Sequence, residues 1–342
     1  MGFLNFFGNG IAVDLGTANT LIMHNDQIVL NEPSIIAVNS ITGEIVAVGR
    51  KAMEMHEKTH ENIKTIKPLK DGVISNFHAA EAMIRGMIGM ITTGKKSLIK
   101  NVEKMVICIP FGATEVEKRA VRDSAEHAGI KDLFMIHEPL AAAIGIGIDI
   151  EEPEGSLVID IGGGTTEIAI IALSGVVTNQ SLKIAGDALN RDILNYMRRN
   201  HNLLIGERTA EKIKMEIGSA LPEMENGPED MAVIGRDLMT GLPKEIKVNY
   251  PEISQCMEKS ISMIEESVIK TLESCPPELA SDIYKKGINL TGGGSGLKGL
   301  DKRLEARTKL KVNVTENNLI SVIKGTGASL KQIKNMKHVL LK

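Results

Sequence analysis

The sequence contains no tryptophan, and only 3% of its 342 residues are aromatic. Its 40 lysines and arginines are outnumbered by 43 acidic residues, which leaves a net charge of −3. No basic run with interleaved aromatic residues occurs, so neither attraction to a phosphate backbone nor stacking on bases is expected. We therefore expect no nucleic-acid partner.

Cysteine is also scarce. Cys108, Cys256 and Cys275 are widely spaced and form no C-x-x-C pair, which excludes a disulfide framework and a cysteine zinc site. No apolar run reaches the roughly 18 residues of a membrane span, and the N-terminus lacks the basic region and length of a signal peptide. We expect a protein of a reducing cytoplasm.

What remains is ordinary for an α/β protein. Hydrophobic residues make up 43% of the chain and charged residues 24%, with 33 glycines. The length allows two domains, each with its own core.

One stretch carries the strongest chemical signal. An apolar run from Ser156 ends in Asp160-Ile161, and the residues Gly162-Gly163-Gly164-Thr165-Thr166 lead into a second apolar run, which predicts a strand, a turn and a strand. Successive N–H groups in such a turn can hold phosphate, and a carboxylate at the strand end can hold hydrated Mg²⁺. A hairpin whose glycines only make the turn explains the same residues.

The residues from Ile11 to Ile22 repeat this plan. Asp14 aligns with Asp160, Gly16 with Gly162 and Thr20 with Thr166. Two related hairpins predict a duplicated architecture in which each half presents a phosphate loop to a shared cleft.

Three further segments are candidates for a site. Glu138 stands between a strand and a helix opening at Pro139, where it either polarises water or is only a helix N-terminal charge. Glu211 and Lys214 share a helix face and either grip ribose hydroxyls and base edges or form an ion pair. Gly292-Gly293-Gly294-Ser295 follows a strand and is a third place for the backbone to approach a ligand.

Two further motif matches are disfavoured. His56-Glu57-Lys58-Thr59-His60 fits the H-E-x-x-H zinc-protease pattern, with Glu81 as a third ligand. The pattern lies in a helix predicted from Arg50 to about Asn62, whose charged flanks favour a solvated face. The segment 89–96 nearly matches a Walker P-loop, but Lys96 replaces its Ser or Thr and a helix precedes it.

The N-terminus holds Phe3, Leu4, Phe6 and Phe7, which include three of the six phenylalanines. This apolar surface must be buried on the protein, on a partner or in a bilayer, and membrane contact is favoured over a tail docked on its own domain. Leu98 and Ile99 lie between lysines and predict a second contact with an anionic membrane.

Taken in order, these motifs resemble the actin, sugar-kinase and seventy-kilodalton chaperone superfamily. Within it the sequence is most similar to the bacterial actin MreB family of rod-shape-determining proteins, including Mbl-like members, over essentially the whole chain. The resemblance is carried by residues 14–20, 31–34, 70–74, 138–145, 160–167 and 235–244. The last of these is the most discriminating, since chaperones and sugar kinases are not expected to share it.

The resemblance implies an α/β actin-like ATPase fold with two related, ribonuclease-H-like halves, each with a smaller inserted subdomain, and a nucleotide cleft between them. Subdomain IA would comprise residues 1–32, 67–145 and 322–342, and IB residues 33–66. Subdomain IIA would comprise 146–183 and 251–321, and IIB 184–250.

The resemblance also implies roles for the candidates. Asp14 and Asp160 would hold Mg²⁺ through water, and the phosphates of ATP or ADP would be wrapped by Thr17, Ala18, Asn19, Gly162, Gly163, Gly164 and Thr165. Glu211 and Lys214 would meet the ribose and base, and Gly292, Gly293, Gly294 and Ser295 would close over the adenosine. The catalytic set would be Glu138, which activates water, with Thr166 and Asp160. His137 departs from the family pattern, in which an acidic residue often precedes the glutamate.

The function so implied is a slow ATPase coupled to polymerisation. It would form paired antiparallel protofilaments at the inner face of the cytoplasmic membrane, associate with membrane morphogenesis proteins and determine cell shape. The alternatives are a soluble actin-fold ATPase or sugar kinase, which would need a sugar site or a peptide-binding domain, and a zinc metalloprotease through His56 and His60.

Overall fold

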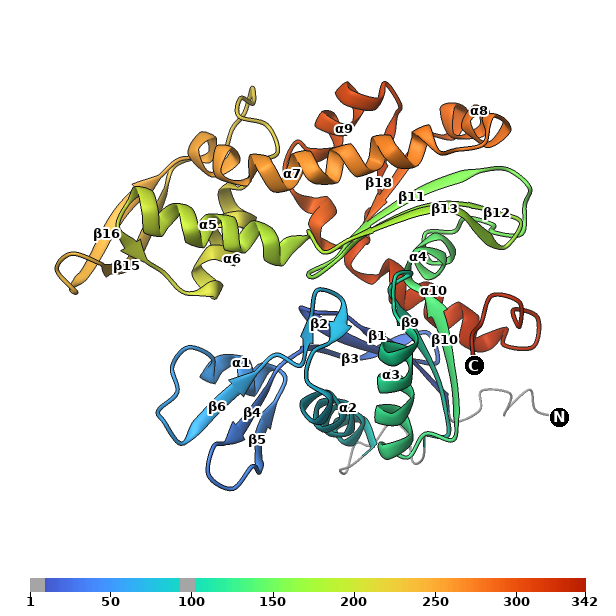
Figure 1. The fold of residues 1–342 in the computed structure, drawn as a ribbon, viewed down its shortest axis with the longest axis horizontal. Coiled ribbons are helices and arrows are strands. Elements are labelled where there is room, and N and C mark those ends of the chain that lie inside the picture. The colour runs from blue at the N-terminus through green and yellow to red at the C-terminus, as the bar shows by residue number, and fades with distance from the viewer. Residues whose placement is uncertain (1–9, 93–101) are drawn as a thin grey trace. The chain divides into compact units, whose positions relative to one another are not determined.

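The computed structural model describes residues 10–92 and 102–342, which form two compact units (Figure 1). Unit 1 contains the described residues up to Pro153 together with Ile171–Val176 and Leu319–Lys342. Unit 2 contains Glu154–Ile170 and Val177–Asn318.

Unit 1 is built on a five-stranded sheet with the order β10-β9-β1-β2-β3. Its strands are β1 (Gly10–Leu15), β2 (Asn19–His24), β3 (Gln27–Pro33), β9 (Lys104–Ile109) and β10 (Asp132–His137). The first three form an antiparallel meander, and β9 and β10 run parallel to β1. Because β1, β9 and β10 are parallel, their carboxyl ends meet at one edge of the sheet.

Smaller elements complete unit 1. They are β4 (Ile36–Asn39), β5 (Ile45–Val48), α1 (Arg50–Met55), β6 (Ile63–Ile66), β7 (Leu69–Lys70), β8 (Val73–Ile74), α2 (Phe77–Thr92), α3 (Glu115–His127), α4 (Glu138–Gly145) and α10 (Ser321–Lys331). Met83 and Met87 of α2 are fully buried in the core, whereas Met90 is 48% exposed. The predicted helix over 50–62 is wrong in length: α1 ends at Met55, and Glu57 has a φ of 61° that a helix does not allow.

Unit 2 has the same strand order. Its sheet, β13-β12-β11-β17-β18, consists of β11 (Ser156–Ile161), β12 (Thr166–Ala172), β13 (Gly175–Leu182), β17 (Ile288–Thr291) and β18 (Val312–Val314). As in unit 1, three consecutive strands are followed by two later ones on the far side of the first, and β17 runs parallel to β11. The duplicated architecture predicted from the two hairpins is therefore confirmed by the sheets.

The remaining elements of unit 2 lie outside this sheet, and three of their strands form a sheet of their own. They are α5 (Gly186–Asn200), β14 (Leu203–Leu204), α6 (Glu207–Ile217), β15 (Met231–Asp237), β16 (Pro243–Val248), α7 (Tyr250–Glu273), α8 (Pro277–Lys286), the 3₁₀ turn η1 (Gly293–Gly296) and α9 (Leu300–Thr308), and a second 3₁₀ turn, η2 (Asn318–Ile320), lies at the boundary of the units. A capping box between Asn249 and Glu252 starts α7. None of the helices in the described ranges is long and apolar enough to cross a membrane.

Helices α4 and α10 of unit 1 touch through glycines. A Cβ atom on Gly325 would lie 1.8 Å from the carbonyl oxygen of Ala141, and one on Gly145 would lie 1.8 Å from that of Ser321. The obstacles are backbone atoms, which cannot rotate away as a side chain can. The packing of α10 against α4 thus requires both glycines.

We expect Gly325→Ala to lower the free energy of unfolding by about 1–3 kcal/mol or more, because the new methyl group must separate the two helices. The matched control is Gly89→Ala in α2, where a Cβ atom meets nothing within 4 Å. That change should stabilise the protein by about 0.5–1 kcal/mol, since alanine is the better helix former. Urea unfolding checks both, and equal effects at the two positions would contradict the packing argument.

Candidate functional site

The turn between β1 and β2 is held in one conformation by hydrogen bonds. The Ser34 hydroxyl donates to the Gly16 carbonyl at 2.6 Å, and the Ser34 N–H donates to the Ala18 carbonyl at 2.9 Å. The Gly72 N–H donates to the Thr17 hydroxyl oxygen at 3.0 Å. Ala18 and the following Asn19 remain exposed, so this loop presents preorganised backbone to the solvent.

Asp14 stands at the end of β1, next to that turn. It accepts a hydrogen bond from the Cys108 thiol of β9, at 3.2 Å. Burial raises the pKa of Asp14 from 3.8 to about 6, and the thiol opposes this rise. The pKa of Cys108 is raised well above its usual value by burial and by the charges of Asp14 and Glu138, so the thiol keeps its proton.

Glu138 occupies the first position of α4, directly after β10, and Pro139 follows it. It therefore lies at the edge of the sheet where β1 and β9 also end. His137 before it packs against the Phe111 ring, with 4.6 Å between centroids. Burial, with the charge of Lys118, lowers the pKa of His137, so the imidazole next to Glu138 is neutral at pH 7.

In unit 2, Asp160 is buried near the end of β11 and lies beside Thr291 of β17. The chain after β17 passes so close that a Cβ atom on Gly292 would lie 2.4 Å from both Asp160 Oδ1 and the Ile161 carbonyl oxygen. Gly292 also has a φ of 80°, which other residues rarely adopt. The two glycine-rich turns of this unit are thus brought together at Asp160.

The Gly162–Thr165 turn is closed by a hydrogen bond from the Gly162 N–H to the Thr165 carbonyl at 2.9 Å. The Asp187 N–H at the start of α5 donates to the Gly163 carbonyl at 2.8 Å. Thr166 is fully buried, and its hydroxyl donates to the Ile184 carbonyl at 2.6 Å. The Thr166 hydroxyl hydrogen is therefore directed at the backbone.

The Gly292–Ser295 turn is fixed by Asn318. The Ser295 hydroxyl donates to the Gly292 carbonyl at 2.7 Å and accepts from the Asn318 side-chain amide at 2.8 Å. The Gly292 N–H donates to the Asn318 carbonyl at 3.2 Å.

Glu211 and Lys214 form the ion pair expected of their spacing, at 2.9 Å on α6. The Lys214 ammonium also donates to the Gly186 carbonyl at 3.3 Å, which joins α6 to the start of α5. The Lys214 side chain is 13% exposed and that of Glu211 46%, so the carboxylate is the more accessible of the two.

Each unit thus gathers its own part of the predicted site. Unit 1 brings together Asp14, Thr17, Ala18, Asn19 and Glu138. Unit 2 brings together Asp160, the two glycine-rich turns, Thr166, Glu211 and Lys214.

Sequence reasoning missed four residues that hold these parts: Ser34, Gly72, Cys108 and Asn318. Ser34 lay within a motif already noted, so its role as a loop support had a signal. Cys108 has no such signal, because nothing in the spacing of Cys108 and Asp14 indicates that they are neighbours.

The zinc-protease pattern is not helical. His56 follows the end of α1 and contacts the Thr65 hydroxyl at 2.8 Å, His60 lies outside any helix or strand, and Glu81 contacts Arg85 and His127 instead. Within residues 10–92 and 102–342, no three His, Cys, Asp or Glu residues are grouped to hold a metal ion. The membrane candidates Phe3, Leu4, Phe6, Phe7, Leu98 and Ile99, and the end of the P-loop segment, lie outside the described residues.

Known proteins are similar to this chain over nearly its whole length. The sequence profile described as MreB/Mbl protein matches residues 8–338. The chain belongs to the MreB/Mbl family. It is 45% identical to the cell shape-determining protein MreB of Escherichia coli K12, over 97% of this chain and 96% of that protein. It is 43% identical to the cell shape-determining protein Mbl of Bacillus subtilis, over 95% of this chain and 96% of that protein.

Solved structures agree with the MreB/Mbl assignment. MreB5 of Spiroplasma citri bound to ADP superposes with a TM-score of 0.89 at 38% identity, over 96% of this chain and 98% of that one. The same protein bound to AMPPNP gives a TM-score of 0.88. The MamK double helical filament gives 0.77 at 21% identity, over 94% of this chain and 98% of that one, and supports the actin-like fold alone.

The raised pKa of Asp14 predicts that the free energy of unfolding falls as the pH rises. The native state binds this proton more tightly than the unfolded chain, so the charged carboxylate lowers stability progressively between pH 3.8 and about 6. Asp14→Asn should therefore raise the free energy of unfolding by about 1–3 kcal/mol at pH 8 and by far less at pH 4. Urea unfolding without nucleotide, with Asp123→Asn of α3 as the control, checks this. A gain independent of pH would contradict the stated cause.

Proposed function

We propose that the chain binds ATP with Mg²⁺, with the loops of each unit taking the contacts that the resemblance assigns to them. The observation that carries this proposal is the repeated arrangement of a carboxylate near the end of a strand, Asp14 or Asp160, beside a rigidly held turn. Preorganised backbone N–H groups and a carboxylate are the chemistry that a phosphate and its hydrated cation require.

The residues present fit such a ligand. At Gly16 a Cβ atom would lie 2.7 Å from the Asn19 carbonyl oxygen, and at Gly292 it would meet Asp160, so both turns depend on the absence of a side chain. Charged Asp14 is disfavoured by burial, and a cation close by offsets that cost. When bound, Mg²⁺ would neutralise phosphate charge through water held by Asp14 and Asp160.

For hydrolysis, we assign to Glu138 the polarisation of the attacking water. Its position at the first turn of α4 supports this role, because the helix fixes the carboxylate at the same sheet edge as Asp14. Thr166 and Asp160 complete the proposed catalytic set. Phosphoryl transfer asks a protein mainly for such positioning and charge stabilisation, and a slow ATPase needs no further nucleophile.

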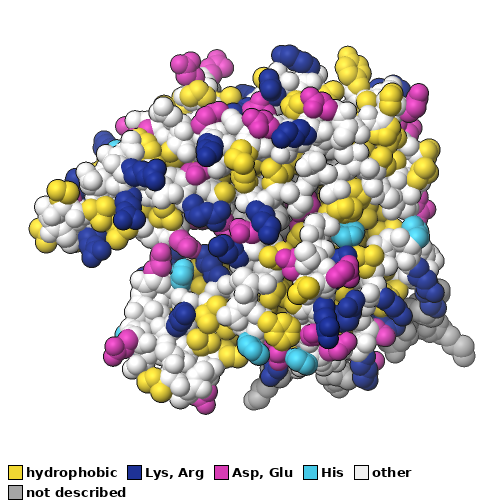
Figure 2. Space-filling view, in the orientation of Figure 1, with side chains coloured by type: hydrophobic (Ala, Val, Ile, Leu, Met, Phe, Trp, Pro, Cys, Tyr) yellow, Lys and Arg dark blue, Asp and Glu magenta, His cyan; other side chains and the backbone are white. Residues whose placement is uncertain are grey.

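We further propose that the protein polymerises into filaments, as paired antiparallel protofilaments, which lie on the inner face of the cell membrane and act with membrane morphogenesis proteins. Self-association is supported by the β15–β16 hairpin, where Met239 and Leu242 are 80% and 65% exposed. Figure 2 shows hydrophobic side chains at this tip, at the left of the view. Its turn is rigid, because Asp237 accepts the Met239 and Thr240 N–H groups, and these bonds with Lys244 lower the pKa of Asp237 to about 2.

Replacing Glu138 tests the catalytic assignment. Glu138→Gln should reduce phosphate release by at least about 100-fold, because water is no longer polarised, while ATP-dependent filaments still form. Phosphate release, pelleting and electron microscopy with ATP and with ADP measure these properties.

Glu115→Gln, at the exposed start of α3, is the matched control and should behave as the unaltered protein. Absence of filaments under all nucleotide conditions, with liposomes present, would contradict the proposed polymerisation. Unchanged phosphate release by Glu138→Gln would remove the role of this residue.

The membrane proposal depends on residues 1–7. Deleting them should reduce co-sedimentation with anionic liposomes, because the apolar side chains of this segment supply the contact. Ile41→Ser removes an apolar side chain that is 77% exposed elsewhere and should leave binding unchanged. If the deletion variant binds as well as the intact chain, the terminal anchor is wrong.

A further inference from the structure

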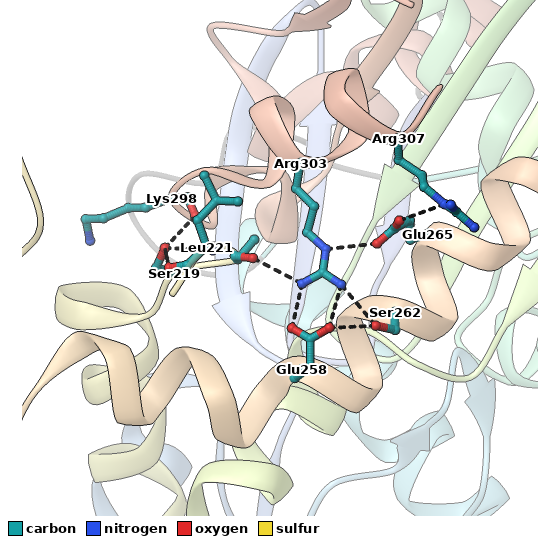
Figure 3. Close-up of polar contacts among 9 residues, drawn as sticks. Ser219, Leu221, Glu258, Ser262, Glu265, Lys298, Arg303 and Arg307 are labelled. Atoms are coloured by element: carbon teal, nitrogen blue, oxygen red, sulfur yellow. Dashed lines mark hydrogen bonds and ion pairs between the residues drawn. The ribbon is translucent and has the colours of Figure 1, made fainter. Parts of the chain in front are cut away.

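Arg303 of α9 uses its entire guanidinium group (Figure 3). Two N–H groups donate to the Glu258 carboxylate, each at 2.7 Å, and Nε donates to Glu265 at 2.9 Å. The remaining two donate to the Ser262 hydroxyl at 2.9 Å and to the Ala220 carbonyl at 3.1 Å. All five donors of the side chain are thus engaged, four on α7 and one on the segment after α6.

Ala220 connects Arg303 to Lys298, which follows the Gly292–Ser295 turn in the chain. Its N–H donates to the Lys298 carbonyl at 2.8 Å, while its own carbonyl accepts from Arg303. Ser219 pairs with Lys298 in an isolated parallel bridge, and its hydroxyl donates to the Leu221 carbonyl at 2.8 Å. The segment 219–221 is therefore held between α9 and Lys298, the second residue after η1.

Lys298 also contacts α6. Its ammonium donates to the carbonyls of Met215 and Glu216, at 3.0 and 2.8 Å, in the last turn of that helix. A cation at this end satisfies carbonyls that have no partner within the helix and interacts favourably with the helix dipole. The same helix carries Lys214 in this last turn and Glu211 about one turn earlier.

We propose that Arg303 and Lys298 are positioning residues for the nucleoside part of the nucleotide. They fix α6, with Glu211 and Lys214, against the Gly292–Ser295 turn, and so set the space in which ribose and base bind. The inference rests on the proposed ATP site. Helices α7 and α9 carry none of the proposed ligand contacts. Through Arg303 they would nevertheless affect the binding of the ribose and base, and not that of the phosphates.

Arg307 provides a matched comparison on the same helix. It pairs with the same Glu265 at 3.1 Å, but its side chain is 59% exposed and its partner lies on α7. It shares the charge and the acidic partner of Arg303 and lacks the contact with Ala220.

The experiment measures the affinity of the full chain for ATP and for inorganic tripolyphosphate by calorimetry, with Mg²⁺. Arg303→Lys keeps the charge but cannot make five directed bonds, so ATP affinity should fall by about tenfold while tripolyphosphate affinity is unchanged. Lys298→Met, which leaves the Arg303 contacts in place, should act in the same direction. Arg307→Gln should leave both affinities unchanged.

The outcomes separate the two proposals. An unaltered chain that binds neither ligand overturns the proposed nucleotide site itself. If that chain binds ATP and both Arg303→Lys and Lys298→Met bind it equally well, the positioning role is wrong. Equal losses for ATP and tripolyphosphate also overturn it, since general damage to the unit weakens both. Should Arg303→Lys fail to fold, Lys298→Met decides the matter.

Discussion

One close approach in unit 2 joins the end of β11 to the turn after its neighbour, β17. Gly292 lies so near Asp160 and the Ile161 carbonyl that no side chain fits at its position. The turn after β17 can lie against the turn after β11 only because this residue is a glycine. Asn318 and Ser295 secure the second turn, while Asp187 secures the first. The two glycine-rich turns that the unit presents to a ligand depend on this contact between two backbones.

Unit 1 holds its turn through hydrogen bonds from residues that lie outside the turn. Here Ser34 supplies both a hydroxyl and an N–H to the turn after β1, and Gly72 supplies a third bond. The two sheets share one strand order, yet the loops at equivalent positions are supported by unrelated residues. The architecture therefore prescribes where the carboxylate and the turn stand, and each half has its own means of keeping them rigid.

The two hairpin strands of each half and the duplication were predictable, because apolar periodicity and the repeated Asp-x-Gly turn are local signals. The end of α1 was not, since the sequence does not reveal that Glu57 adopts a positive φ. Partners distant in the chain were also beyond prediction: Cys108 lies 94 positions from Asp14, and Ala220 lies 83 from Arg303. Such pairs are set by strand register and helix packing, which no short window of sequence contains.

The thiol between Asp14 and Glu138 has a practical consequence. The thiolate is the form that attacks alkylating reagents, and burial beside two carboxylates suppresses that form of Cys108. Burial also raises the pKa of Cys256 to about 12 and that of Cys275 above its usual value. The folded chain thus has a low chemical background for attaching a fluorophore to an introduced surface cysteine. The rate at which Cys108 is alkylated therefore reports how often the strands around Asp14 open.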